Sequence, residues 1–390
     1  MSFSMSRPLA FSSLIPLEKV SAMNKRKIRV LFDTPDPKLH GGPPTHLPLL
    51  EKELRKHVDL EAYVYGRRTD SETIFNKIMD RSKDLVMLRS KILKFRPDII
   101  HHNTAFDPIA ILRDVPLLWL AKRHRIPAFL KMHGSKNDLF RQRPYLPNLF
   151  RNYVLNNSAG IGVLSHIERN EYLTAWPRLS TRVQVVKNII KPEFYSIERR
   201  ESTIPSFLFI SRFIEEKGIF DLLTAVPRVL KRCSNAQFIF IGSGTDASKF
   251  DEKVKEKSLC QVVRRINHIA NLETLAFYAS AWALIFPTRL QEGMPMVIAE
   301  AMAGGVPIVT TRTKFSQSYM EDGKHCLFID YGSPSSIADA LIRLVESPGL
   351  RSGMSKNSRQ LADSFRADIV TREFTSIYKN FCELPHRAEA

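Results

Sequence analysis

Two glutamates with seven residues between them, Glu292 and Glu300, lie in the stretch of the sequence that points most clearly to chemistry. The stretch follows the apolar run Trp282–Phe286, which predicts a buried strand. Pro295 suits the first position of a helix, and Gly304-Gly305 suits the end of one. Glu292 is therefore expected in a loop and Glu300 on a short helix. Carboxylates in these two places can each accept hydrogen bonds from a pair of neighbouring hydroxyls, one pair on a ribose and one on a sugar.

The start of that helix offers a second kind of binding group. The first N–H groups of a helix have no partner within it, and the helix dipole favours negative charge there. We therefore expect the backbone at this point to bind an anion. The residues assigned to substrate binding in this stretch are Gly293, Met294, Pro295, Met296, Val297 and Glu300.

A basic pair follows another predicted strand, Ser206–Ile210. Arg212 and Lys217 stand five residues apart, just past the end of this strand. Arginine can hold phosphate oxygens through two parallel hydrogen bonds, and lysine contributes a point charge. The two side chains can thus converge on two neighbouring phosphates. When the segment is taken by itself, a solvated basic pair is the alternative interpretation.

Two glycine turns and one histidine complete the candidate site. Gly41-Gly42 follows the first predicted strand and opens a helical pattern, so that its backbone can approach a phosphate; a plain tight turn is the alternative. Gly242 and Gly244 follow another apolar run. His133 ends the predicted strand Ala128–Met132, where a functional role competes with a structural one. His101 and His102, in a further strand, are interpreted as structural.

The elements that must position these residues alternate between short apolar runs and helical patterns along the whole chain. The predicted strands are Lys27–Asp33, Leu60–Tyr65, Asp98–His102, Ala128–Met132, Gly160–Leu164, Val183–Lys187, Ser206–Ile210, Gln237–Ile241, Trp282–Phe286, Val306–Thr310 and Cys326–Phe328. Such alternation is typical of βαβ units with parallel sheets. It occurs twice, on either side of a polar stretch near residues 188–205. Two doubly wound, Rossmann-like domains are therefore expected to face each other across a cleft, with ligands at the carboxyl ends of the strands.

The predicted division of the chain has four parts. Residues 1–24 form a disordered leader, with a signal peptide as the alternative, and residues 25–190 form an acceptor-side domain. Residues 191–365 form a nucleotide-sugar-binding domain, and residues 366–390 form a helix that returns to the first domain. No stretch is long and apolar enough to cross a membrane. The four cysteines are scattered without a CxxC pair, which indicates reduced thiols rather than a zinc site.

The net charge of +18 is distributed unevenly. Residues 1–200 hold 35 Lys and Arg against 19 Asp and Glu, whereas the remainder is almost neutral. Such an excess attracts nucleic acid, anionic lipid or phosphorylated substrates, or it simply keeps the surface solvated. Because no nucleic-acid-binding motif accompanies the charge, a nucleic-acid partner is not expected.

The segment from Glu292 to Gly305 resembles the signature of the retaining GT-B glycosyltransferases of family 4. The resemblance extends from about Lys27 to Phe381 and is densest in the second half. It implies that the segment from Arg212 to Gly218 neutralises a departing diphosphate, that Gly41-Gly42 lies beneath that diphosphate, and that His133 lies close to the donor sugar. It also implies that Gly242 and Gly244 lie beside the nucleotide, and that the anomeric configuration is retained.

The sequence departs from the family pattern at several positions. Asn267-His268 stands where many members have glycine before the turn that binds the base, so the base is left open. Lys187–Ile190 and Gly134 also differ from the usual residues. Asn267 and His268 are nevertheless assigned to substrate binding. The predicted catalytic residues are His133, Arg212, Lys217 and Glu292, and no cofactor or metal is predicted.

The predicted activity is transfer of a hexosyl unit from a nucleotide-diphosphate sugar to a lipid-linked or membrane-associated acceptor, in polysaccharide, lipopolysaccharide or glycolipid biosynthesis. A soluble enzyme with a small sugar or sugar-phosphate acceptor, or a nucleotide-sugar epimerase, is the alternative. Residues 122–125 and 131–151 combine basic with apolar side chains, which predicts docking on an anionic membrane surface. The expected location is cytoplasmic, at the inner face of the membrane. Packing of these apolar residues in the core is the alternative for this segment.

Overall fold

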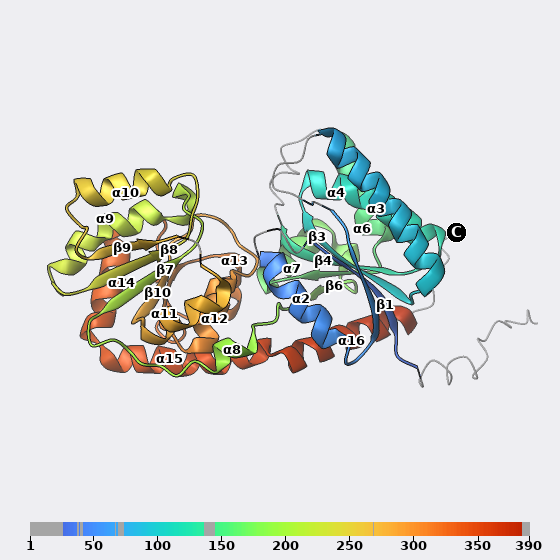
Figure 1. Ribbon diagram of the computed structural model, residues 1–390. Coiled ribbons are helices and arrows are strands. Elements are labelled where there is room, and N and C mark those ends of the chain that lie inside the picture. Colours follow the sequence, from blue (N-terminus) through green and yellow to red (C-terminus); the bar gives the residue numbers. More distant parts are fainter. Residues whose placement is uncertain are drawn as a thin grey trace, which may run out of the picture.

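The computed structural model describes residues 26–36, 39, 42–66, 68, 74–135, 145–267 and 269–383, and it has two lobes side by side (Figure 1). Each lobe is built on a six-stranded parallel sheet, in the order β2-β1-β3-β4-β5-β6 in the first lobe and β12-β11-β10-β7-β8-β9 in the second. Helices cover both faces of each sheet. The fold is therefore the predicted GT-B arrangement of two Rossmann-like domains.

The strands of the first lobe are β1 (Arg29–Thr34), β2 (Asp59–Val64), β3 (Ile99–Phe106), β4 (Ala128–Ser135), β5 (Gly160–Val163) and β6 (Val183–Val185). Its helices are α2 (Gly42–Leu54), α3 (Ile74–Phe95), α4 (Pro108–Arg123), α6 (Tyr145–Asn157), α7 (His166–Ala175) and η1 (Pro177–Leu179). The short helix α8 (Pro192–Tyr195) follows them.

The strands of the second lobe are β7 (Ser206–Ile210), β8 (Gln237–Ile241), β9 (Val263–Ile266), β10 (Ala283–Phe286), β11 (Ile308–Thr311) and β12 (Leu327–Ile329). Its helices are η2 (Glu215–Lys217), α9 (Ile219–Leu230), α10 (Ala247–Glu256), η3 (Asn271–Thr274), α11 (Leu275–Ser280), α12 (Met296–Gly304), α13 (Lys314–Tyr319), α14 (Pro334–Glu346), α15 (Pro348–Ala362) and η4 (Asp363–Phe365). The last helix is α16 (Ala367–Glu383).

Two hydrophobic cores pack against opposite faces of the first sheet. One core lies beneath α3, α4, α6 and α7 and contains Leu88, Ile111 and Val154. The other lies beneath α2 and α16, where Phe374 and Phe381 pack with Phe32 and Phe129 of the strands. In Figure 1, α16 runs from below the second lobe to the first. The end of the chain thus completes the core of the domain in which the chain begins.

The two lobes contact each other where α7 meets α13. The Lys314 ammonium pairs with the Glu171 carboxylate at 2.6 Å; the Lys314 side chain is largely shielded from solvent, and the Glu171 side chain is about one third exposed. The Tyr319 hydroxyl donates a hydrogen bond to the carbonyl of Leu164 at 3.2 Å. These contacts hold the carboxyl end of β5 against the second lobe.

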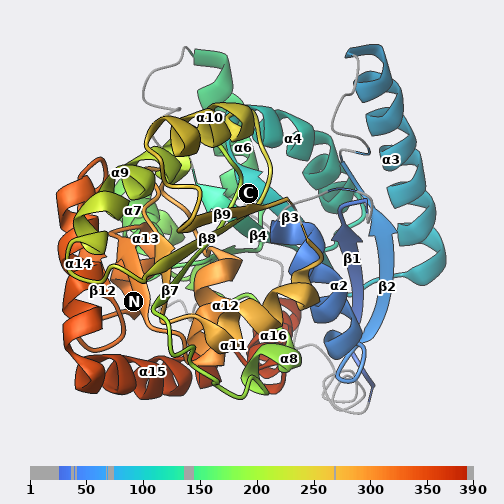
Figure 2. The ribbon, with the colours of Figure 1, turned by 60° about the vertical axis from the view of Figure 1, so that its left-hand side comes forward.

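Figure 2 shows α3 as the outermost helix of the first lobe, next to the edge strand β2. Helix α4 packs between α3 and α6. Within the described part of the chain, no helix has both the length and the apolar character that a membrane span requires.

Candidate functional site

The ends of β7 and β10 are joined by an ion pair between Lys217 and Glu292. Lys217 ends the 3-10 turn η2, and its side chain is nearly buried, with 6% of the residue exposed. Its ammonium group also lies 5.2 Å from the ring centre of Phe286. The Arg289 N–H donates to the Glu216 carbonyl at 2.7 Å, which holds the two loops together through the backbone. The predicted diphosphate ligand and the predicted sugar ligand are therefore direct neighbours.

Glu300 lies on α12, apart from this pair, and is 3% exposed. Its carboxylate accepts hydrogen bonds from the Asn271 amide at 2.7 Å and from the Tyr278 hydroxyl at 3.0 Å. Burial raises the pKa of Glu300 to about 7, and the two hydrogen bonds oppose this shift only in part. Asn271 and Tyr278 fix the orientation of the carboxylate, and Glu300 therefore has a defined geometry before any ligand arrives.

Helix α12 begins one residue later than the sequence predicts. Pro295 is the residue before the helix, in an extended conformation, rather than its first helical residue. Proline has no N–H to offer, so the free donors at this terminus begin at Met296. The helix ends at Gly305, whose left-handed conformation matches the predicted stop. Gly293, Met294 and Pro295 are buried, and Met296 and Val297 are partly exposed.

Gly293 lies where the two lobes touch. A Cβ atom at this position would come within 2.9 Å of Cδ1 of Leu164, the residue that follows β5. Contacts this short essentially never occur for real Cβ atoms, so a side chain at residue 293 would require the Leu164 side chain to shift. Leu164 was not predicted as a site residue.

The loop after β8 packs against the segment that follows β7. Gly242 has a φ of +145°, and a Cβ there would collide with the Ser211 carbonyl oxygen. A Cβ on Gly244 would collide with the backbone of Phe213. Both glycines therefore allow β8 to lie against the chain that carries Arg212, whose side chain is exposed. This close packing requires glycine at both positions whether or not a ligand binds beside them.

His133 is oriented by Asn103, a residue of β3 that the sequence did not single out. Its Nε2 lies 2.8 Å from Oδ1 of Asn103. Because the Asn103 amide nitrogen donates to the Asp33 carbonyl at 2.7 Å, Oδ1 is the accepting atom. Nε2 therefore carries the proton, and Nδ1 is left as an acceptor. The pKa of His133 lies well below its usual value, mainly because the ring is buried and to a lesser extent because Lys131 and His46 are nearby. The ring is therefore neutral.

His101 and His102 are fully buried within the first lobe. His101 contacts the Tyr378 hydroxyl of α16 at 2.5 Å. His102 lies between two carboxylates, 3.0 Å from Asp33 and 2.9 Å from Asp114. Burial opposes protonation of His102, but the two carboxylates raise its pKa to about 9. These contacts give both histidines a structural role.

Lys131, one residue of the predicted docking segment 131–151, is not available to a membrane surface, which corrects the prediction at this position. Its side chain is fully buried on β4, and its ammonium nitrogen has no hydrogen-bond partner in the described structure. It lies 5.2 Å above the ring of Phe374 on α16. The alternation of side chains along β4 places Lys131 on the same inward face as Phe129, and so away from solvent. Burial lowers the pKa of Lys131 to about 7.

Several predicted residues lie outside the described part of the chain, including Gly41, His268 and positions 136–144 of the docking segment. Gly42 is the first residue of α2. Asn267 is exposed, and its Oδ1 accepts from Arg265 at 2.6 Å. Across the described ranges, no three His, Cys, Asp or Glu side chains are grouped so as to hold a metal ion.

Residues 191–361 match the model of the family described as "Glycosyl transferases group 1". The alpha-monoglucosyldiacylglycerol synthase of Acholeplasma laidlawii is 20% identical over 315 residues, which cover 74% of this chain and 76% of that protein. The D-inositol 3-phosphate glycosyltransferase of Corynebacterium urealyticum is 25% identical over 315 residues, covering 75% of this chain and 74% of that one.

Among solved structures, Alr3699/HepE of Anabaena in complex with UDP and glucose superposes with a TM-score of 0.67 at 14% identity. The superposition covers 90% of this chain and 99% of that one, and it shows a shared fold. Together with the match over the second lobe and the similarity to named transferases, the architecture identifies the chain as a glycosyltransferase with the GT-B fold.

Proposed function

We propose that this glycosyltransferase moves a hexosyl unit from a nucleotide-diphosphate sugar to an acceptor with retention at the anomeric carbon, as the family 4 enzymes that its sequence resembles do. The observation that carries the proposal is the ion pair of Lys217 with Glu292. It places a cation suited to a diphosphate directly beside a carboxylate suited to sugar hydroxyls, at the carboxyl ends of two parallel strands.

The nucleotide half of the donor is assigned to α12. In its ionised form, the Glu300 carboxylate accepts hydrogen bonds from the two ribose hydroxyls, in the orientation that Asn271 and Tyr278 fix. Glycines at positions 242 and 244 border the nucleotide from β8. The solved relative with UDP and glucose is consistent with a ligand of this class.

The departing diphosphate is assigned to Arg212 and Lys217. When the bond from the anomeric carbon to the diphosphate oxygen breaks, its electron pair stays with that oxygen, and the two cations stabilise the negative charge. The acceptor hydroxyl attacks from the same face, and its proton passes to the departing oxygen. The N–H groups near Gly42 and Met296 add to this stabilisation. In this proposal the cations and N–H groups take the place of a metal.

The donor sugar lies between Glu292 and His133 in this proposal. His133 is neutral, and its Nδ1 is an acceptor, so the ring can receive a hydrogen bond from a sugar hydroxyl. Asn103 holds the ring in that tautomer and orientation. A neutral histidine adds no positive charge beside an anomeric carbon that becomes oxocarbenium-like.

The acceptor is proposed to be lipid-linked or membrane-associated, in glycolipid, lipopolysaccharide or polysaccharide assembly. Similarity to a synthase of monoglucosyldiacylglycerol over three quarters of both chains supports this class. The basic first half of the chain supports it independently, since it suits an enzyme at the inner face of a membrane. The similar identity to an inositol phosphate glycosyltransferase favours the alternative, a small sugar-phosphate acceptor.

A donor screen followed by an acceptor screen tests these assignments. Thermal unfolding is first measured with UDP, GDP and ADP, and one of them is expected to stabilise the protein. The matching radiolabelled nucleotide sugar is then incubated with the enzyme and either extracted lipid or soluble sugar phosphates. Label in the organic phase supports the lipid acceptor, and label only in soluble product supports the alternative. Stabilisation by none of the nucleotides would contradict the donor assignment.

A further inference from the structure

Exposed apolar side chains gather on one side of the first lobe. Of the ten large apolar side chains that are exposed in the described part of the chain, seven lie on α3, α4 and α6. These three helices cover the same face of the first sheet and pack side by side. The second lobe shows only scattered examples, and single exposed apolar residues are normal. The concentration on one helical layer therefore calls for a physical explanation.

On α4 the exposed apolar residues form a stripe. Ile109, Leu112 and Trp119 are separated by three and seven residues, which places them on one side of the helix. Ile109 is 82% exposed and Trp119 is 58% exposed. Lys122 and Arg123 follow in the last turn of the same helix, and both are exposed. The opposite side of α4 fills the core, with Ile111 and Leu118 fully buried. The stripe is thus not part of the packing of the lobe.

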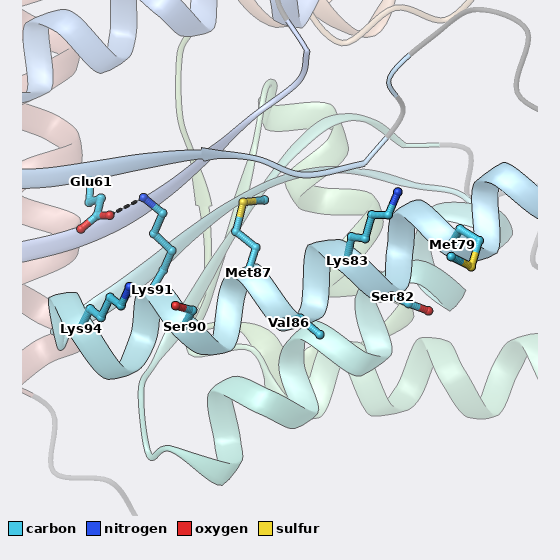
Figure 3. Close-up of a pocket in the computed structure, with 9 residues that line it drawn as sticks. All are labelled: Glu61, Met79, Ser82, Lys83, Val86, Met87, Ser90, Lys91 and Lys94. Atoms are coloured by element: carbon cyan, nitrogen blue, oxygen red, sulfur yellow. Dashed lines mark hydrogen bonds and ion pairs between the residues drawn. The ribbon is translucent and has the colours of Figure 1, made fainter.

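Helix α3 repeats this arrangement. Met79, Val86 and Leu93 are exposed at intervals of seven residues, so they line one side of the helix. Lys83 and Lys94 project beside them and are also exposed. Figure 3 draws Met79, Lys83, Val86 and Lys94 on α3, where basic and apolar side chains are interspersed along the helix.

A groove of about 660 Å³ runs along α3. Met79, Val86 and Met87 provide its apolar lining, and Lys83 and Lys94 lie along it (Figure 3). The third lysine of the groove, Lys91, is paired with Glu61 of the edge strand β2, and Lys83 lies 3.7 Å from the Asp80 carboxylate of its own helix. The groove therefore offers cationic groups next to an apolar surface.

We infer that the exposed layer of α3 and α4 docks on an anionic phospholipid bilayer. This inference rests on the proposed function, because an enzyme with a lipid-linked acceptor requires access to a membrane. The positive charge of this lobe complements the negative charge of an anionic phospholipid bilayer. The half of the chain that carries the layer holds nearly all of the excess positive charge. Apolar stripes flanked by lysines match a headgroup layer, where aliphatic side chains enter the acyl boundary and ammonium groups meet phosphates.

The inferred surface differs from the segment that the sequence indicates. Only Lys122 and Arg123 are common to both, whereas Lys131 is buried. Trp119 is the central residue, because indole rings favour the interface between water and lipid. Its substitution should therefore test docking without disturbing the donor site, from which it is absent.

Flotation of the full-length protein with vesicles tests the inference. At low salt, binding is expected to vesicles of phosphatidylcholine with phosphatidylglycerol and not to phosphatidylcholine alone, and added salt should weaken it. Trp119→Ser and the pair Lys83→Glu/Lys94→Glu should each lower binding about tenfold or more. Trp119→Phe should retain it. Matched controls in the second lobe, Tyr331→Ser and Lys255→Glu/Lys257→Glu, should bind as the wild type does.

Nucleotide-induced thermal stabilisation is measured on the same variants. Normal stabilisation with absent vesicle binding in the wild type would overturn the docking inference alone. The docking inference would also be overturned if the control variants lost vesicle binding to the same extent, or if the α3 and α4 variants bound vesicles as the wild type does. A third outcome would also overturn the docking inference: no vesicle binding, together with self-association or binding of another protein that the α3 and α4 variants abolish. That result would assign the surface to a protein partner. Vesicle binding without any nucleotide response would leave docking intact and count against the proposed donor.

Discussion

Lys217 and Glu292 are 75 residues apart in the sequence, and their side chains form an ion pair that joins the loops after β7 and β10. The pair neutralises both charges in the unliganded protein. In the proposed mechanism, the diphosphate therefore meets a cation whose orientation a carboxylate already fixes. The arrangement links the proposed leaving-group ligand to the proposed sugar ligand.

Replacement of the two glutamates should separate nucleotide binding from transfer. Glu300→Ala should weaken the affinity for the nucleoside diphosphate about tenfold or more, because it removes hydrogen bonds to a charged acceptor. Glu292→Ala should leave that affinity nearly unchanged and lower the transfer rate. Calorimetric titration and steady-state kinetics measure the two effects, with Glu256→Ala on the exposed face of α10 as the control. Equal losses of nucleotide affinity in both variants would contradict this division of roles.

Removal of the basic pair should act on the rate. Arg212→Ala and Lys217→Ala should each lower kcat by about 10²–10³, the usual effect of losing one charge-stabilising contact in a transition state. The double variant should be still slower. Turnover that survives in the double variant would remove the pair from the mechanism.

Chelation provides a separate test of the proposed catalysis. If Arg212 and Lys217 stabilise the diphosphate without a metal, turnover in excess EDTA should equal turnover in buffer alone. Activity that requires added Mg²⁺ or Mn²⁺ would contradict this part of the proposal. The measurement uses wild-type enzyme with the donor identified in the nucleotide screen.

The pH dependence of stability should report the ionisation of Glu300. Its pKa is raised in the folded protein to about 7, so folding favours the protonated form. The associated stability is complete below the ordinary pKa of a glutamate and is lost as the pH rises through about 7. Relative to Glu300→Gln, the wild type should therefore lose on the order of 3 kcal/mol between pH 4 and pH 8. Denaturant unfolding at several pH values measures the difference, and parallel curves for the two proteins would contradict it.

The same ionisation should control nucleotide affinity. Only the ionised carboxylate accepts from both ribose hydroxyls, so affinity should rise as the pH increases from 6 to 8. In Glu300→Gln this rise should be absent.

The sequence predicts the position of a residue well where neighbouring residues in the sequence determine it, and poorly where tertiary packing determines it. The bounds of β7 and β8 agree with the predicted ones because both strands are short apolar runs with clear ends. Strand β9 was missed because two arginines occupy its four positions, as an edge strand at the side of the sheet tolerates. The Lys217–Glu292 contact follows from the parallel order of the strands. Asn103, Asn271, Tyr278 and Leu164 were missed because only tertiary packing brings them to the site.

Lys131 gives a second test based on pH. Burial lowers its pKa in the folded protein to about 7, so the unfolded chain binds the proton more strongly. Folding stability should therefore rise as the pH increases from 7 toward the ordinary lysine range, and Lys131→Met should remove this dependence. At pH 7 the variant should be the more stable protein by a few kcal/mol, with a gap that closes near pH 10. A gap that is constant with pH would contradict the assignment.

Two glycine substitutions should have opposite effects on stability. Gly242→Ala forces a Cβ against the Ser211 carbonyl at a φ of +145°, so it should destabilise the second lobe by several kcal/mol. Gly353 lies within α15 with no atom near its would-be Cβ, and Gly353→Ala should stabilise the protein by up to about 1 kcal/mol. Thermal unfolding of both variants measures the contrast.

The return of α16 to the first lobe has a consequence for biosynthesis. Phe374 and Phe381 belong to the core that also contains Val30 and Phe32, so the part of this sheet face that α2 does not cover stays open until α16 leaves the ribosome. The strands of the second lobe run from Ser206 to Ile329. This lobe can therefore form its sheet before α16 is available to complete the core of the first lobe. A nascent chain stopped before α16 would expose the apolar face of β3 and β4 and would be a target for chaperones. Completion of the first lobe therefore requires a helix that is synthesised after the strands of the second lobe.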